Sequence, residues 1–301
     1  MARTRPETGP ILLVLLCFAQ FMLVLDYSVV AVALPAMQQD LGINQGSAQW
    51  VFSAFSLAYG GFMISAGRAV DLLGAKRILL VGIVLFTVAS ALCGLAINGP
   101  MLFGARALQG LGAALVSPAA LTLVTGSFAE GDARNRAFGI WGAVASTGMV
   151  AGNLVGGLLT GLASWEWVFG INVPIGVVVL VGVAVLVGRD EVAERRRTDV
   201  LGASLLTAGS VLVVSAVSRL ADGLSVPVVL SGVLGIGLLA AFLVVERRVA
   251  EPIVRLSMFA NPSIRYGNLL AAVGAASGLA TTWFGTHSQS GSSKKPQWHT
   301  G

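Results

Sequence analysis

The chain has 301 residues, of which 55% are hydrophobic and only 11% are charged, whereas about a quarter of the residues of an ordinary soluble domain carry a charge. Its mean hydropathy of +0.84 and its net charge of +5 exclude a typical soluble protein and indicate a basic membrane protein. The two cysteines, Cys17 and Cys93, lie in apolar runs and provide neither a disulfide framework nor a metal-ligand spacing.

Nine apolar stretches are long enough to cross a bilayer, because a helix needs about 20 residues to span about 30 Å of hydrocarbon. They lie at 11–35, 48–67, 78–97, 101–125, 137–160, 167–188, 200–217, 227–245 and 266–285. The first stretch is about twice as long as the apolar region of a cleaved signal peptide, so we expect it to remain as a span. The pattern predicts an all-α polytopic membrane protein.

Basic residues lie on one side of this arrangement. The N-terminus and the loops after the second, fourth, sixth and eighth spans carry Arg3, Arg5, Arg68, Lys76, Arg77, Arg134, Arg136, Arg189, Arg195, Arg196, Arg197, Arg247, Arg248, Arg255 and Arg265. The loops between spans on the opposite side carry only Arg219. The positive-inside rule therefore predicts a cytoplasmic N-terminus. Because the charge is spread over short loops and no basic face with interleaved aromatic residues is present, nucleic acid is not an expected partner.

Catalytic motifs are missing from the sequence. It contains no Walker A, HExxH or G-x-S-x-G pattern, and both histidines, His287 and His299, lie in the polar tail. We therefore expect neither an enzyme nor an ATP-driven pump, and we expect no metal or organic cofactor.

Two charged residues interrupt the apolar spans. Asp26 lies in the first span and Arg106 in the fourth, which runs in the opposite direction. At about 1.5 Å per residue, Asp26 lies roughly 13 Å and Arg106 roughly 9 Å below the same outer surface. A charge near the bilayer centre costs about 2.5–3.5 kcal/mol on insertion scales, so such groups usually face the bundle interior. The two charges can therefore pair, directly or through water.

Two interpretations of this pair remain open. It is either a static salt bridge that stabilises the bundle or part of an ion pathway. The second is favoured because ionisable residues inside a membrane usually mark such pathways. Burial also disfavours the charged form of a carboxyl group, which can bring proton exchange near neutral pH.

A glycine ladder occupies the fifth span. Gly148, Gly152 and Gly156 recur every four residues and are followed by Gly157 and Gly161. Small residues at this spacing allow helices to approach closely. Spacing alone does not distinguish a functional ladder from ordinary tight packing.

Several stretches, in order along the chain, carry a family resemblance. They are LDYSVVAVALP at 25–35, GRAVDLLGAKR at 67–77, the R-x-x-Q-G pattern at 106–110, GMVAGNLVGG at 148–157 and WEWVFGINVPIG at 165–176. Over about residues 10–285 the chain resembles the major facilitator superfamily, and within it the fourteen-helix family of drug:proton antiporters.

The resemblance implies roles for individual residues. Asp26 would be the titrating group, Arg106 would compete with the proton for it, and Gln109 and Gly110 complete the fourth-helix signature. The loop after the second span would latch helix ends and gate the conformational switch through Gly67, Asp71, Gly74, Lys76 and Arg77.

Two stretches depart from the family pattern. The antiporter-type glycine motif is formed by Gly148, Gly152, Asn153, Gly156 and Gly157, with Asn153 in the place of the usual proline, which weakens the case for antiport specifically. Glu166 stands where the family has an arginine.

The resemblance also implies a domain order. We expect a cytoplasmic N-terminus at 1–10, a six-helix bundle at 11–188, a basic loop at 189–199, a linking helix pair at 200–245, a cytoplasmic loop at 246–265, the first helix of an incomplete second bundle at 266–285 and a polar tail at 286–301. The family continues through a second six-helix bundle, so the chain resembles a family member truncated at its C-terminus.

The function that follows is proton-coupled efflux of drugs or other hydrophobic or cationic small molecules across the cell membrane. The proton gradient would be the energy source, and the partners would be the bilayer, the substrate, protons and a second copy or the missing C-terminal half. The alternative is a truncated fragment that is inactive in transport or depends on a partner.

Overall fold

The computed structural model describes residues 9–188, 200–220, 223–247, 261–262 and 265–270. The expected basic loop at 189–199, the tail and residues 271–285 of the ninth expected span lie outside these residues. The chain divides into two compact units, Met1–Ile253 and Val254–Gly301. All the helices described below belong to the first unit.

Helices cover the first eight expected spans, which confirms the all-α class. They are α1 (Gly9–Asp40), the short α2 (Gln45–Ala48), α3 (Trp50–Leu73), α4 (Ala75–Gly94), α5 (Gly99–Ser127), α6 (Asp132–Leu162), the short α7 (Glu166–Gly170), α8 (Asn172–Leu186), α9 (Val200–Leu220) and α10 (Val226–Glu246). Among the described residues, seven helical segments are long and apolar enough to cross a membrane, and Leu201–Val217 is a shorter apolar helix.

Local sequence signals set several helix ends. Asn98 precedes α5, and its side chain accepts a hydrogen bond from the Met101 amide at 2.9 Å, which satisfies one of the unpaired donors of the first turn. Gly74 separates α3 from α4 with φ = 94°, a conformation that residues with a side chain rarely adopt. The bend between the two helices therefore depends on a glycine.

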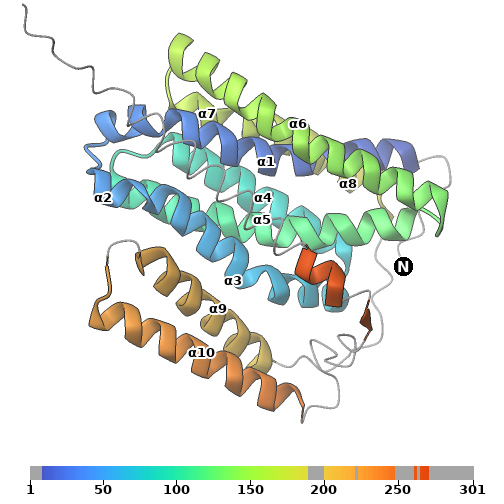
Figure 1. The fold of residues 1–301 in the computed structure, drawn as a ribbon. Coiled ribbons are helices and arrows are strands. Elements are labelled where there is room, and N and C mark those ends of the chain that lie inside the picture. Colours follow the sequence, from blue (N-terminus) through green and yellow to red (C-terminus); the bar gives the residue numbers. More distant parts are fainter. Residues whose placement is uncertain (1–8, 189–199, 221–222, 248–260, 263–264, 271–301) are drawn as a thin grey trace, which may run out of the picture. The chain divides into compact units, whose positions relative to one another are not determined.

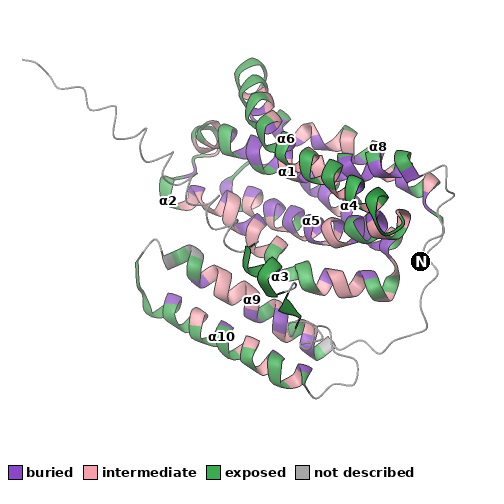
Figure 2. Cartoon of the chain, turned by 45° about the vertical axis from the view of Figure 1, so that its right-hand side comes forward, coloured by how far each residue is buried: buried purple, intermediate pink, exposed green. Residues whose placement is uncertain are grey.

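The helices pack in a definite order. Helix α5 lies between α3 and α4, while α1 packs against α6 and α8 (Figure 1). Buried residues follow the facing sides of α1, α4 and α5, whereas α6 and α10 are largely exposed (Figure 2). Exposed apolar side chains on such helices are expected where a surface faces lipid.

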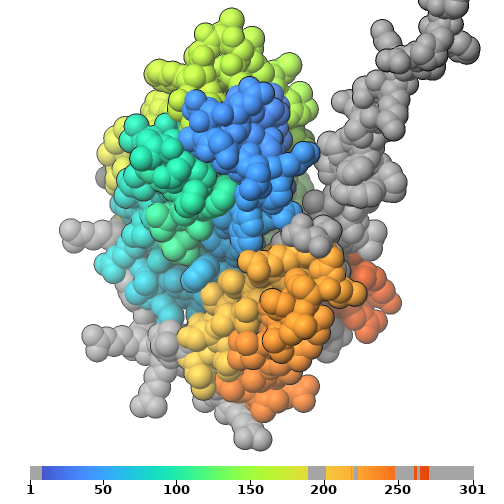
Figure 3. Space-filling view, turned by 90° about the vertical axis from the view of Figure 1, so that its left-hand side faces the viewer, coloured from blue at the N-terminus to red at the C-terminus, as the bar shows by residue number. Residues whose placement is uncertain are grey.

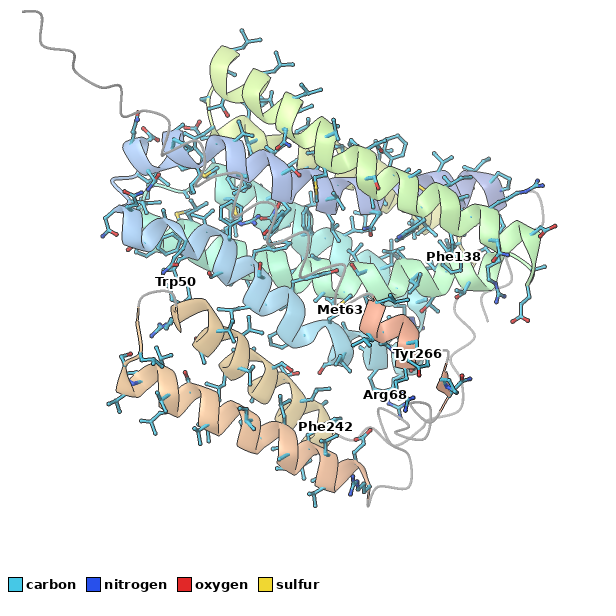
Figure 4. The ribbon with its side chains drawn as sticks, viewed as in Figure 1. Trp50, Met63, Arg68, Phe138, Phe242 and Tyr266 are labelled. Carbon is cyan, nitrogen blue, oxygen red and sulfur yellow. The ribbon has the colours of Figure 1, made fainter. Side chains whose placement is uncertain are left out.

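Helices α9 and α10 form a pair that contacts the rest of the unit mainly through α3 (Figure 3). The Ser65 hydroxyl lies 2.7 Å from the Thr207 hydroxyl, and Val211 fits against Gly61. At the other end of α3, the Arg219 guanidinium lies 5.2 Å from the centre of the Trp50 ring (Figure 4). The expected linking pair is thus an α-helical hairpin packed on α3, and its linking role remains a prediction.

Two apolar clusters form the core. One contains Leu16, Leu23, Phe86 and Val116, and the other contains Leu25, Cys93, Leu102 and Phe169. Along α1, the boundary between them falls after Leu23, one helical turn or less from Asp26. Polar side chains collect at this boundary and form the candidate site.

Candidate functional site

The two intramembrane charges form a direct ion pair. Nη1 of Arg106 on α5 donates to Oδ2 of Asp26 on α1 at 2.6 Å, and both side chains are completely buried. Opposite charges at similar depth on neighbouring helices meet here as the sequence predicted. Removing either partner leaves the other charge buried without compensation, which is strongly unfavourable.

Two amides hold the second oxygen of the carboxylate. Nε2 of Gln109 donates to Oδ1 of Asp26 at 2.7 Å, and Nδ2 of Asn172 donates to the same oxygen at 2.8 Å. Gln109 was a predicted site residue. Asn172 was not, although it stands in the quoted stretch at 165–176.

A serine hydroxyl on α4 joins the two amides. Oγ of Ser90 accepts a hydrogen bond from Nε2 of Gln109 at 2.7 Å and a longer one from Nδ2 of Asn172 at 3.4 Å. The Cys93 thiol, one turn further along α4, lies 3.7 Å from Oε1 of Gln109. The sequence did not single out Ser90, because a single serine in an apolar span does not reveal whether its side chain faces the bundle interior or the lipid.

The Arg106 guanidinium is fixed on several sides. Its Nε donates to the Val51 carbonyl oxygen on α3 at 2.9 Å, and Nη1 also donates to Oε1 of Gln109 at 2.6 Å. The Phe55 ring lies below the guanidinium, with 4.4 Å between its centre and Cζ. Such a contact of a cation with an aromatic face adds attraction where water is excluded.

Glycines on α5 bring these groups within reach of one another. A methyl group at Gly110 would lie 2.2 Å from the Phe55 carbonyl oxygen, and one at Gly112 would lie 2.6 Å from the Phe86 backbone nitrogen. Only glycine allows the backbones of α3 and α4 to approach α5 this closely. Gly110, predicted from the fourth-helix signature, is therefore a packing residue next to the ion pair.

The predicted gating loop lies away from the buried site. Gly67 is in α3, Asp71 is exposed near the end of that helix, and Gly74 makes the bend to α4. Arg77 is exposed in the first turn of α4.

Lys76 connects this loop to α8. Its Nζ donates to the Ala184 carbonyl oxygen at 2.9 Å and to the Val187 carbonyl oxygen. These carbonyls belong to the last turn of α8, where helical carbonyls lack partners within the helix and attract a positive charge. Lys76 thus ties the start of α4 to the end of α8, and the gating role that the resemblance implies stays a prediction.

The glycine ladder lies against α1. Methyl groups at Gly148, Gly152 and Gly156 would come within 3.3 Å, 2.6 Å and 3.2 Å of atoms of α1, whereas one at Gly157 would have nothing within 4 Å among the described residues. Asn153 is exposed. Three of the predicted glycines therefore pack against the helix that carries Asp26, and Gly157 does not.

An open apolar groove lies beside this contact. Its volume is about 470 Å³, and its walls include Leu13, Phe18 and Phe21 of α1 and Ile140 and Val144 of α6. The groove and the buried ion pair thus share α1.

The buried site can hold a carboxylate in its ionised form. Three donors reach the two Asp26 oxygens, and no charge other than that of Arg106 is bonded to it among the described residues. A proton can be accepted only if at least one of these bonds changes.

Comparison with known proteins places this architecture in a family. The family model described as Major Facilitator Superfamily matches residues 16–294. The cephamycin export protein CmcT of Amycolatopsis lactamdurans is 41% identical over 288 residues, which are 93% of this chain and 59% of that protein. The puromycin resistance protein pur8 of Streptomyces alboniger is 41% identical over 259 residues, which are 86% of this chain and 51% of that protein.

A solved structure shows the same fold. A crystal structure of the peptide transporter POT superposes with a TM-score of 0.59 at 21% identity, covering 79% of this chain and 52% of that protein. The chain thus spans little more than half the length of the relatives and the structure it matches.

Proposed function

Because this chain belongs to the major facilitator superfamily, we propose that it acts in proton-coupled efflux of hydrophobic or cationic small molecules, antibiotics among them. The family and the apolar helices make it a multi-pass membrane protein of a transporter family rather than an enzyme. Relatives named for cephamycin export and puromycin resistance support export and the substrate class.

The buried Asp26–Arg106 pair is the observation that best supports coupling of transport to protons. It is fully buried and lies at the boundary of the two apolar clusters, as an ion pathway inside the bundle would require. In the proposed cycle, the Asp26 carboxylate exchanges Arg106 for a proton. A proton that crosses the membrane supplies about 2.3 kcal/mol per 100 mV, which drives the uphill export of substrate.

The apolar groove between α1 and α6 supports a hydrophobic substrate. Its walls offer aromatic and branched aliphatic side chains, which suit an apolar molecule or the apolar part of a cation. Helix α1 contributes both to the groove and to the buried site. A molecule in the groove would therefore contact the helix that carries Asp26.

Within the superfamily, we assign the chain to the fourteen-helix drug:proton antiporters in the cell membrane, with the N-terminus in the cytoplasm. The α9–α10 hairpin after six spans fits the linking pair of that family, and Lys76 and Arg77 lie at the end where basic loops are expected. Transporters of this kind work by rocking one helix bundle against another around a central site. We therefore propose that transport by this chain requires a second helix bundle.

The test is efflux from membrane vesicles that contain the chain, with an imposed proton gradient and a panel of dyes and antibiotics. Asp26→Asn should abolish efflux driven by the gradient, whereas Asp40→Asn, which changes the exposed carboxylate at the end of the same helix, should retain it. Efflux by Asp26→Asn that keeps its dependence on the gradient refutes the role of Asp26.

The competing hypothesis is a chain that binds a partner and transports nothing. Absence of efflux of every compound from vesicles with the unmodified chain, together with a monomeric mass in detergent, supports this alternative and contradicts autonomous transport.

A further inference from the structure

The hydrogen bonds around Asp26 suit only its ionised form. Oδ2 accepts from Arg106, and Oδ1 accepts from Gln109 and Asn172. A protonated carboxyl group carries one O–H, which needs an acceptor when it is buried. Among the described residues, each group bonded to Asp26 presents a donor to it, so proton uptake requires one of these three partners to change.

Two of the three partners are held in place. Arg106 has no acceptor atom, whatever its orientation. Gln109 uses both ends of its amide, because its Nε2 donates to Asp26 and Ser90 while its Oε1 accepts from Arg106 at 2.6 Å. Turning this amide would break all three bonds and point its NH₂ group at the guanidinium.

The third partner, Asn172, differs in one respect. Its Nδ2 donates to Asp26, but its Oδ1 is buried and has no hydrogen-bond partner among the described residues. A buried acceptor without a partner is unusual in native structures and calls for an explanation. Rotation of this amide breaks the two bonds of Nδ2, to Asp26 and Ser90, but none at its oxygen, and it brings Oδ1 to the position of Nδ2 beside the carboxyl group.

The backbone at Asn172 is set by close packing. Asn172 is the first residue of α8, and four residues later a methyl group at Gly176 would lie 2.0 Å from Oγ1 of Thr87 on α4. Ser90 is one turn from Thr87 on the same helix. This contact holds the start of α8 against α4, so the side chain of Asn172 can turn while its backbone stays in place.

We propose that Asn172 is a positioning residue that lets Asp26 exist in two protonation states inside the buried site. It donates Nδ2–H to the ionised carboxylate, and after half a turn about its Cβ–Cγ bond it accepts the O–H of the protonated carboxyl group through Oδ1. The Ser90 hydroxyl, which accepts from Asn172 in the first state, donates to Oδ1 in the second, since a hydroxyl can do either.

The groups that face Asp26 define the setting of this switch. Helix α5 contributes Arg106, and α8 contributes Asn172. Cys93 of α4 contacts Gln109 rather than Asp26 itself, and α6 faces this part of α1 with glycines. The only covalent bond that changes is the O–H bond formed on the Asp26 carboxylate, whose proton comes from a hydronium ion in the surrounding water. The inference rests on the proposed proton binding at Asp26, but not on transport.

Infrared difference spectra of the purified chain in lipid bilayers, recorded between neutral and acidic pH, test the switch. The band of the protonated Asp26 carboxyl group is assigned by its loss in Asp26→Asn. In Asn172→Leu, which is similar in size and neither donates nor accepts, this band should move to higher frequency because the O–H has lost its acceptor.

Three outcomes contradict the proposal. In the first, the band of Asn172→Leu stays at its original frequency and only the midpoint of its titration changes. Asn172 then only donates to the carboxylate and does not accept from the protonated form. An unchanged band and midpoint remove Asn172 from the site altogether. No Asp26 band in the unmodified chain refutes proton binding itself, and with it the proposed coupling, whatever the efflux assay gives.

A second measurement needs no Asn172 variant and so does not depend on how one folds. In the unmodified chain labelled with ¹³C at the asparagine side-chain carbonyl, acidification should shift one amide carbonyl band to lower frequency as Oδ1 gains its hydrogen bond. The shift should be absent from labelled Asp26→Asn. A spectrum without such a band, in a chain whose Asp26 does take up a proton, overturns the rotation.

Discussion

Helices α5 and α6 are nearly equal in length, with 29 and 31 residues, and both are rich in glycine, but they are packed very differently. Helix α5 lies between two neighbours and buries residues along much of its length. Helix α6 packs mainly on α1 and buries only Ala137, Gly148, Gly152 and Gly156.

The tightest glycine contacts of the two helices differ in the atoms that they meet. At Gly110 and Gly112 of α5 the nearest atoms belong to the backbones of α3 and α4, whereas Gly152 of α6 meets the side chain of Ser28 and the Leu25 carbonyl oxygen. The hydroxyls of Ser146 and Thr147 on α6 bond to the backbone of their own helix. The close helix contacts of α5 therefore bring polar groups together, whereas those of α6 only pack that helix against α1.

The largest loss of stability is expected when the charge on α5 is removed. Arg106→Leu leaves the Asp26 carboxylate buried without its partner, which should lower the free energy of unfolding by about 3–5 kcal/mol. Unfolding of the purified chain in detergent, followed by circular dichroism, measures the loss. The double variant with Asp26→Asn should recover most of it, because it removes the uncompensated charge, and failure to recover would contradict the pairing.

A smaller loss is expected at the α5 glycine. Gly110→Ala places a methyl group against the Phe55 carbonyl oxygen, and overpacking of this kind costs about 1–3 kcal/mol. Gly104→Ala on the same helix is the matched control, since a methyl group there meets nothing within 4 Å among the described residues. Equal stability of the two variants would mean that α3 can move away from α5 without consequence.

The smallest loss is expected in α6. Gly152→Ala should cost about 1 kcal/mol, at the low end of the overpacking range, because part of the contact is a serine side chain. Gly157→Ala should be neutral or slightly stabilising, since alanine has the higher helix propensity. If Gly152→Ala destabilises the chain more than Gly110→Ala, the contrast between the two helices is wrong.

The sequence predicted the parts of the site that carry strong signals. A charge in an apolar span is conspicuous, and the distances of Asp26 and Arg106 from their span ends predicted that the two could pair, as they do. The glycine ladder was also predictable, because residues four apart share one helix face. Gly157 is one residue beyond Gly156, roughly 100° further around the helix, and so points away from α1.

Two uncharged members of the site, Ser90 and Asn172, could not be predicted in the same way. Ser90 and Asn172 are single polar residues in apolar stretches, and their partners depend on how α4 and α8 rotate about their axes. The partner of Lys76 was likewise hidden, since the end of α8 lies more than 100 residues away along the chain. Such contacts follow from packing, which a single sequence does not specify.

Helix α8 is tied at both ends. Its first residue, Asn172, bonds to the buried Asp26, and the carbonyls of Ala184 and Val187 at its other end accept from Lys76. The helix has 15 residues and is therefore roughly 22 Å long. Because an intact α-helix hardly stretches, it acts as a strut of constant length between the buried carboxylate and the bend after α3. Helix α8 thus joins the bend after α3 to the buried carboxylate through hydrogen bonds at its two ends.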